Sequence, residues 1–101
     1  MSDQTVTLIN QFKVDPVNQK TLIAMLKDNI ETVIRTLEGW KETRLMAAQD
    51  GASVVIYSQW ASPAAVEAMR TNPRMTAYFP KIGAIAKIES TSTEEVLRAQ
   101  R

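Results

Sequence analysis

The sequence predicts an α+β domain with the element order β-α-β-β-α-β and four antiparallel strands in one sheet. Two observations lead to this prediction. A strand pattern near the amino terminus is followed at once by a long amphipathic helical pattern, and two further strand patterns joined by an Asp-Gly turn precede more helical signals. This order is that of the ferredoxin-like fold. With 101 residues the chain has the usual size of one domain, so we expect a single domain over 1–101.

The first strand is expected at 5–14, because apolar and polar residues alternate there. Its apolar face comprises Val6, Leu8, Asn10, Phe12 and Val14. The stretch DPVNQK then starts a helix, with Asp15 as N-cap and a proline in the first helical position. Apolar residues recur at helical spacing up to residue 37, and Gly39 suits the end of the helix. We therefore expect a helix over about 16–37.

The second and third strands are expected at 40–48 and 53–61, with a turn at 49–51 between them. Ser62 and Pro63 then open a short helix that reaches about residue 70. A further helical segment runs from 73 to about 86, and Pro80 is expected to kink or divide it. The residues alone leave the end of the chain open. KIES at 87–90 could be the fourth strand, with Ser92 and Glu95 capping a last helix, or TEEVLRAQ at 93–100 could be the strand.

Composition excludes several classes of function. The net charge is +1, with 12 Lys and Arg against 11 Asp and Glu, so we expect no nucleic-acid partner. No apolar run approaches the ~20 residues of a membrane span, and MSDQTV resembles no secretion signal. A cytoplasmic protein is the default expectation. The chain has no Cys and no His, so we expect no disulfide and no metal site, and any chemistry must use carboxylates, amides, phenols, indoles, Lys or Arg.

The predicted sheet has helices on one face and leaves its other face bare. Pairing with a second copy of the chain is the simplest way to cover that face, so we expect a homodimer.

Asn10 poses a question, because it lies on the apolar face of the first strand. A buried carboxamide costs roughly 1–3 kcal/mol unless it is hydrogen-bonded. It could bond the backbone or a neighbouring side chain, or its face could border a ligand pocket. Trp60, at the end of the third strand, offers a large flat surface and one N–H group, although the residue taken alone favours a core role over a catalytic one.

Three stretches of the chain resemble the antibiotic biosynthesis monooxygenase family: VTLINQFKV before a proline and a long helix, EGW before a strand, and VVIYSQWAS before a short helix. The most specific parts are Ile-Asn-x-Phe and Tyr-x-Gln-Trp. The resemblance covers nearly the whole chain. It implies a dimeric α/β barrel with a cavity in each subunit and a last strand at about 93–100. It also implies oxidation of aromatic polyketide or quinol-type substrates by O2, with no metal or flavin cofactor.

The resemblance further implies that Asn10 and Trp60 line the cavity and act as the catalytic pair. Other side chains could bind the small aromatic substrate. Tyr57 and Tyr78 could supply phenolic donors, Arg44 and Lys81 could stabilise an anion, and Phe12 and Met69 could line the cavity. Each of these also has an ordinary reading as core or surface.

Two departures from the family leave a second function open. Quinone-forming members often carry an Asn four residues before the strand-three Trp, where this chain has Ile56. Many relatives also have a His near the position of Met46. These differences favour a non-catalytic binding or stress-response module as the alternative. Haem degradation is disfavoured, because without His or Cys only a Tyr or Met could ligate the iron.

Overall fold

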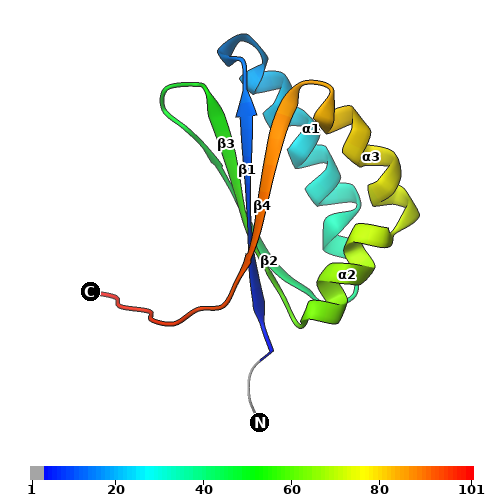
Figure 1. Cartoon of the computed structure of the whole chain (residues 1–101), viewed down its shortest axis with the longest axis vertical. Coiled ribbons are helices and arrows are strands. Elements are labelled where there is room, and N and C mark those ends of the chain that lie inside the picture. Colours follow the sequence, from blue (N-terminus) through cyan, green and yellow to red (C-terminus); the bar gives the residue numbers. More distant parts are fainter. Residues whose placement is uncertain (1–3) are drawn as a thin grey trace.

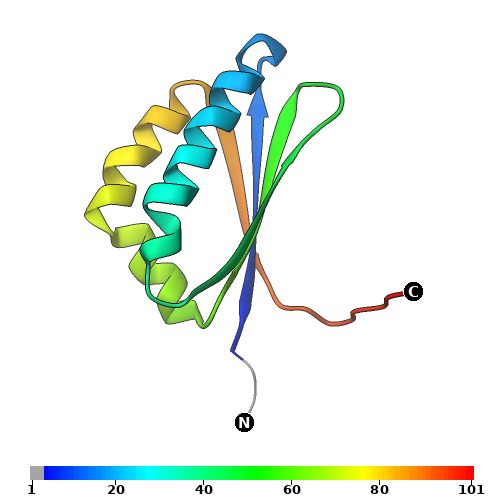
Figure 2. The same ribbon diagram turned by 180° about the vertical axis from the view of Figure 1, so that it is seen from behind.

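Four antiparallel strands form one sheet in the order β2-β3-β1-β4, and the helices cover only one of its faces (Figures 1 and 2). This computed structural model describes residues 4–101. The order of elements confirms the ferredoxin-like prediction. The elements are β1 (Val6–Val14), η1 (Pro16–Asn18), α1 (Gln19–Thr32), η2 (Ile34–Thr36), β2 (Trp40–Ala47), β3 (Ser53–Trp60), α2 (Pro63–Thr71), α3 (Pro73–Gly83) and β4 (Ala86–Thr93).

The segment expected as one helix over 16–37 is an α-helix flanked by two 3-10 turns. Asp15 caps the first turn, and its side chain accepts a hydrogen bond from the Val17 N–H at 3.0 Å. The α-helix itself ends at Thr32, earlier than predicted, and Val33 departs from helical geometry with φ −120°. Gly39 has φ +85° and turns the chain into β2, as expected of a glycine after a helical segment.

The second helical region consists of α2 and α3, which Asn72 separates. Ser62 caps α2 by accepting from the Ala65 N–H, and Asn72 caps α3 by accepting from the Arg74 N–H. Of the two effects expected of Pro80, division of the helix is wrong, because α3 runs unbroken from Pro73 to Gly83 with Pro80 inside it.

The last strand departs most from the expectation taken from the resemblance. β4 spans Ala86–Thr93 and includes the KIES stretch, whereas residues 94–101 form neither strand nor helix. The prediction of a strand at 93–100 is therefore wrong, and so is a last helix capped by Ser92 and Glu95. The physical reason is the pairing with β1, which places Ala86 and Ile88 opposite Val14 and Phe12 on the covered face. Val96 and Leu97 find no such burial and are 89% and 79% exposed.

The tail 94–101 leaves the sheet on the side away from the helices (Figure 1). The amino-terminal residues 1–3, on which the expectation of no secretion signal partly depends, lie outside the described residues. Within the described part of the chain, no helix combines the length and apolarity needed to cross a membrane.

The core fills the space between the sheet and the helices as two clusters. One gathers around Trp60 and Leu8 and includes Val66 of α2, and the other joins Phe12 and Val54 of the sheet to apolar side chains of α1 and α3. Fully burying each large apolar side chain contributes about 1.5–3 kcal/mol. The two clusters therefore hold the helices against the sheet. A cavity lies between them.

Candidate functional site

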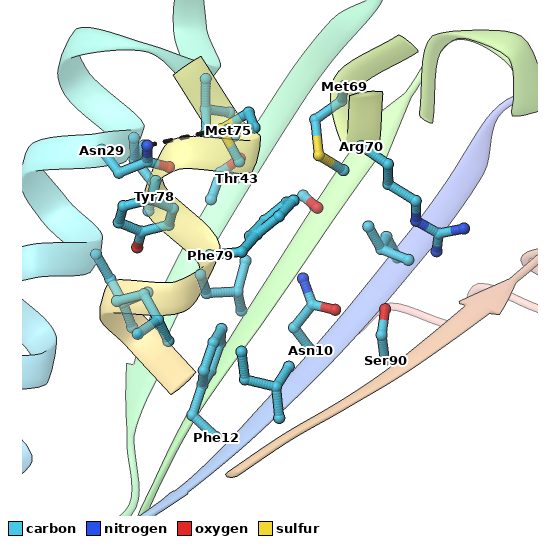
Figure 3. A pocket seen from close by; sticks show the side chains of 18 of the residues that line it. Asn10, Phe12, Asn29, Thr43, Met69, Arg70, Met75, Tyr78, Phe79 and Ser90 are labelled. Carbon is cyan, nitrogen blue, oxygen red and sulfur yellow. Dashed lines mark hydrogen bonds between the residues drawn. The ribbon is translucent and has the colours of Figure 1, made fainter. Parts of the chain in front are cut away.

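A cavity of about 330 Å³ lies between the sheet and the helical layer (Figure 3). Its floor is formed by the covered face of the sheet, and its walls by α1, α2 and α3. Most of its lining is apolar, with a few amide and hydroxyl groups. Small-molecule sites in proteins commonly have this size and this composition.

The register of the sheet sets the polarity of the floor. Asn10 of β1 lies between Ile56 of β3 and Ser90 of β4, and these three side chains share the covered face. One row away, Thr43 of β2 pairs with Ser58 of β3, and both of these also line the cavity. Strand alternation therefore places polar groups side by side in an otherwise apolar chamber.

The Asn10 side chain points into this cavity, as the family resemblance implies (Figure 3). None of the hydrogen bonds among the described residues involves its carboxamide. The amide is half-buried, so the cost of removing it from water is not offset by a protein partner. Asn10 thus offers both a donor and an acceptor to whatever occupies the cavity.

Trp60 lines the same cavity and is only 1% exposed. Its indole N–H donates to Ser58 Oγ at 3.2 Å, so this N–H already has a partner within the protein. The Trp60 ring contributes an apolar surface to the cavity, and the Ser58 hydroxyl is the group of this pair that can bond a ligand. Because Ser58 Oγ accepts from the indole, its own proton remains to be donated.

The helical side of the cavity carries two more polar groups. The Tyr78 hydroxyl is buried and has no hydrogen-bond partner among residues 4–101. Burial, and secondarily the negative charge of Asp28, raise the pKa of Tyr78, so this phenol stays neutral across the physiological range. Beside it, the Asn29 amide donates to Met75 Sδ at 3.6 Å, a weak acceptor (Figure 3).

Sequence reasoning missed Asn29, although a signal was present. It occupies the apolar stripe of α1, where Leu22 and Leu26 precede it at helical spacing. A carboxamide in such a stripe raises the same question as Asn10 does in its strand.

Arg70 is the other residue that was missed. It lies near the end of α2, follows the buried Met69 and lines the cavity, although the residue is exposed overall. No ion pair or hydrogen bond among the described residues involves its guanidinium. The sequence signal for Arg70 was its position next to Met69, which lies on the apolar face of a helix with a clear N-cap.

The structure brings together most of the predicted site residues. Asn10, Phe12, Trp60, Met69 and Tyr78 all line the cavity, and Ile56 lines it beside them.

Tyr57 and Arg44 do not line it, and the expectation that they lie in the same site is wrong. They pair across β3 and β2 on the opposite face of the sheet, where the Arg44 guanidinium lies 5.5 Å from the Tyr57 ring centroid. Arg44 Nε also donates to Glu42 Oε1 at 2.7 Å. The reason is strand alternation, since Tyr57 lies between Ile56 and Ser58, which both face the cavity. Lys81 is exposed and is not a lining residue either.

Among the residues that the structure describes, no group of three or more His, Cys, Asp or Glu could hold a metal ion.

The fold and site define an α+β protein with a ligand-sized apolar chamber and polar groups on its floor. A family model described as antibiotic biosynthesis monooxygenase matches residues 5–81, and the chain belongs to this family of monooxygenases. The tetracenomycin-F1 monooxygenase of Streptomyces glaucescens is 36% identical over 78 residues, which cover 77% of this chain and 70% of that protein.

Solved structures show the same fold at lower sequence identity. Rv0793 from Mycobacterium tuberculosis has a TM-score of 0.82 and 23% identity, covering 95% of this chain and 99% of that one. SnoaB, a cofactor-independent oxygenase from Streptomyces nogalater, has a TM-score of 0.79 and 17% identity, covering 97% of this chain and 99% of that one.

Proposed function

We propose that this protein oxidises a small aromatic substrate of the polyketide or quinol type with O2, inside the cavity and without a metal or flavin. The observation that carries the proposal is the Asn10 carboxamide, which points into an apolar chamber and has no partner among the described residues. Membership of the monooxygenase family supports it, as do the names of two similar proteins, a tetracenomycin-F1 monooxygenase and a cofactor-independent oxygenase.

The reaction balances without an added reductant. An anthrone-type CH2 carbon loses a proton to give a delocalised carbanion, which reacts with O2 and takes up a proton to form a hydroperoxide. The O–O bond then breaks as the remaining C–H proton leaves, which gives the quinone carbonyl and one molecule of water. The substrate is oxidised by four electrons, and O2 accepts all four.

The cavity suits this chemistry in two ways. Its apolar walls exclude water and accommodate both an aromatic ring system and the nonpolar O2 molecule. Asn10 can donate a hydrogen bond to the oxygen on which negative charge develops. Losing one such donor typically costs about 3 kcal/mol of transition-state stabilisation, which is about a hundredfold in rate.

Oxygen uptake with 1,8-dihydroxyanthrone tests the proposal, after subtraction of the uncatalysed rate. Asn10→Ala is expected to lower the turnover rate about a hundredfold while circular dichroism stays unchanged. Gln11→Ala is the matched control, since Gln11 is the next residue of β1 and lies on the other face of the sheet. Equal rates in both variants, or no uptake by the wild type with anthrones and hydroquinones, would refute the oxygenase proposal.

A specific observation supports the alternative of a binding module without catalysis. Ile56 lies directly opposite Asn10, where an amide would give the floor a second donor. If the protein is a binding module, the wild type binds the anthrone without consuming O2. Ile56→Asn distinguishes the two, because added donor capacity is expected to increase oxygen uptake by an oxygenase and to leave a binding module inactive.

We also propose that two copies of the chain associate through the uncovered face of the sheet. That face carries Ile9, Val55 and Tyr57 among polar side chains, and the helical layer does not shield it (Figure 2). Burying such a face against a second copy is a common solution for sheets of this kind.

A further inference from the structure

The ionisable groups of the cavity form a very small set. Among the described residues that line it, only Arg70 has a basic side chain and only Tyr78 has an acidic one, and no carboxylate faces the chamber. Tyr78 cannot serve as a base near neutral pH, because its burial favours the neutral phenol. The cavity therefore holds one cation and no group able to remove a proton from a substrate.

Arg70 is placed where a substrate anion would benefit from it. Figure 3 shows its side chain extending from α2 toward the side of the cavity floor where Asn10 and Ser90 lie. Asn10 and Ser90 are cross-strand partners on β1 and β4, and neither side chain has a hydrogen bond among the described residues. An amide, a hydroxyl and a guanidinium, which are all hydrogen-bond donors, thus line one side of the chamber.

Carboxylates close to Arg70 could compete for its charge. Glu67, one helical turn earlier on α2, and Glu94, just after β4, lie with Arg70 around a shallow hollow that adjoins the cavity. Neither forms an ion pair with Arg70 in the described structure. The Arg70 guanidinium is a cation without a counter-ion among the described residues.

We propose that Arg70 makes the cavity selective for the ionised form of an acidic, delocalised substrate, such as a polycyclic phenol or the enol of a 1,3-diketone. Asn10 and Ser90 bind the oxygen that carries the charge, and Arg70 supplies the compensating cation. The proton leaves to water, so a hydroxyl compound and water become a bound anion and hydronium. This inference rests on the proposed function and adds the substrate class and a specificity-determining residue.

A dye that reports its own ionisation tests this directly. Alizarin, a dihydroxyanthraquinone, changes colour on losing its first proton, so a spectrophotometric pH titration with saturating protein gives the pKa of the bound dye. Removing a nearby positive charge disfavours an anion, so Arg70→Gln is expected to raise that pKa by about one unit relative to wild type. This equals about a tenfold loss of preference for the anion over the neutral dye.

Two control variants separate charge from shape. Arg70→Lys keeps the positive charge and is expected to retain most of the preference for the anion. Arg35→Gln makes the same chemical change at an exposed position of η2 outside the cavity lining, and is expected to leave the bound pKa at the wild-type value. Added salt should shrink the difference between wild type and Arg70→Gln, because mobile ions screen a partly exposed cation.

The other outcomes would refute the inference about Arg70, the oxygenase proposal, or both. If the dye binds but Arg70→Gln leaves its pKa unchanged, the charge-selection inference falls and the oxygenase proposal stands. If Arg70→Gln weakens binding of alizarin and of its uncharged dimethyl ether equally, Arg70 acts by packing, and the inference also falls. If neither alizarin nor 1,8-dihydroxyanthrone binds the wild type, both the inference and the proposed function are refuted.

Discussion

The indole N–H of Trp60 donates to Ser58 Oγ at 3.2 Å, and both side chains are buried. These residues are two apart on β3 and share its covered face. Trp40 forms a parallel arrangement, since its N–H donates to Thr43 Oγ1 at 2.8 Å, and Thr43 is the cross-strand partner of Ser58. The two indoles thus hold two neighbouring hydroxyls whose own protons remain to be donated.

Trp60→Phe is expected to destabilise the fold by about 1–3 kcal/mol, because it removes a buried N–H bond and leaves a gap beside Val66 and Leu8. Ser58→Ala leaves the buried indole N–H without its acceptor and should lower the stability by a similar amount. The double variant should cost less than the sum, since neither unsatisfied partner remains. Urea denaturation of all four proteins measures this coupling, and strict additivity would argue against the hydrogen bond.

Tyr78→Phe is expected to be neutral or to stabilise the ligand-free protein by up to about 1 kcal/mol, because it removes a buried hydroxyl that has no partner in the described part of the chain. The pH dependence has a definite sign. The folded state raises the pKa of Tyr78, so above about pH 10 the unfolded chain loses this proton first and stability falls as the pH rises. Urea melts between pH 8 and 11 should show a steeper alkaline loss in wild type than in Tyr78→Phe. Parallel curves would contradict the assignment.

Ile9→Asp is expected to dissociate the proposed homodimer, because it places a charge in the middle of the uncovered face, opposite Tyr57 and Thr91. Sedimentation equilibrium at micromolar concentration should then give a monomer, and the wild type a dimer. Val17→Asp is the control, since Val17 is 80% exposed in η1 and away from the sheet. A monomeric wild type would rule out the proposed association.

Gly39→Ala is expected to destabilise the protein by about 1–3 kcal/mol, for two reasons. Its φ of +85° disfavours any side chain, and an added Cβ would lie 2.5 Å from the Ala65 Cβ of α2. Gly83→Ala is the matched control. It ends α3, its added Cβ would meet no described atom within 4 Å apart from its chain neighbours and the adjacent helix backbone, and we expect a small stabilisation instead. Thermal unfolding of the two variants should therefore shift in opposite directions.

The sequence was sufficient where a pattern is local. Alternation on β1 and helical spacing on α1 predicted both elements and placed Asn10 on the covered face. The same parity argument separates Tyr57 from Trp60 and Ile56, so its place outside the cavity could have been predicted too.

The last strand was harder, because the local pattern left two segments open, KIES at 87–90 and TEEVLRAQ at 93–100. Between Ser90 and Thr93 the residues of both faces are polar, so only pairing with β1 identifies the strand. The family resemblance favoured the second segment, although its apolar residues Val96 and Leu97 are 89% and 79% exposed. Arg70 depends on tertiary geometry in the same way, since the sequence alone does not show which end of α2 approaches the floor.

The pairing of β4 with β1 makes the chemistry of the chamber sensitive to chain length. In the observed register Ile88 and Ser90 face inward, while Lys87 and Glu89 face outward. Only residues 84 and 85 connect α3 to β4. Losing or gaining one residue there would exchange the two faces and bring a lysine and a glutamate to the floor. A cavity floor without charged side chains would become one with fixed charges of both signs, although no residue of β4 had been substituted.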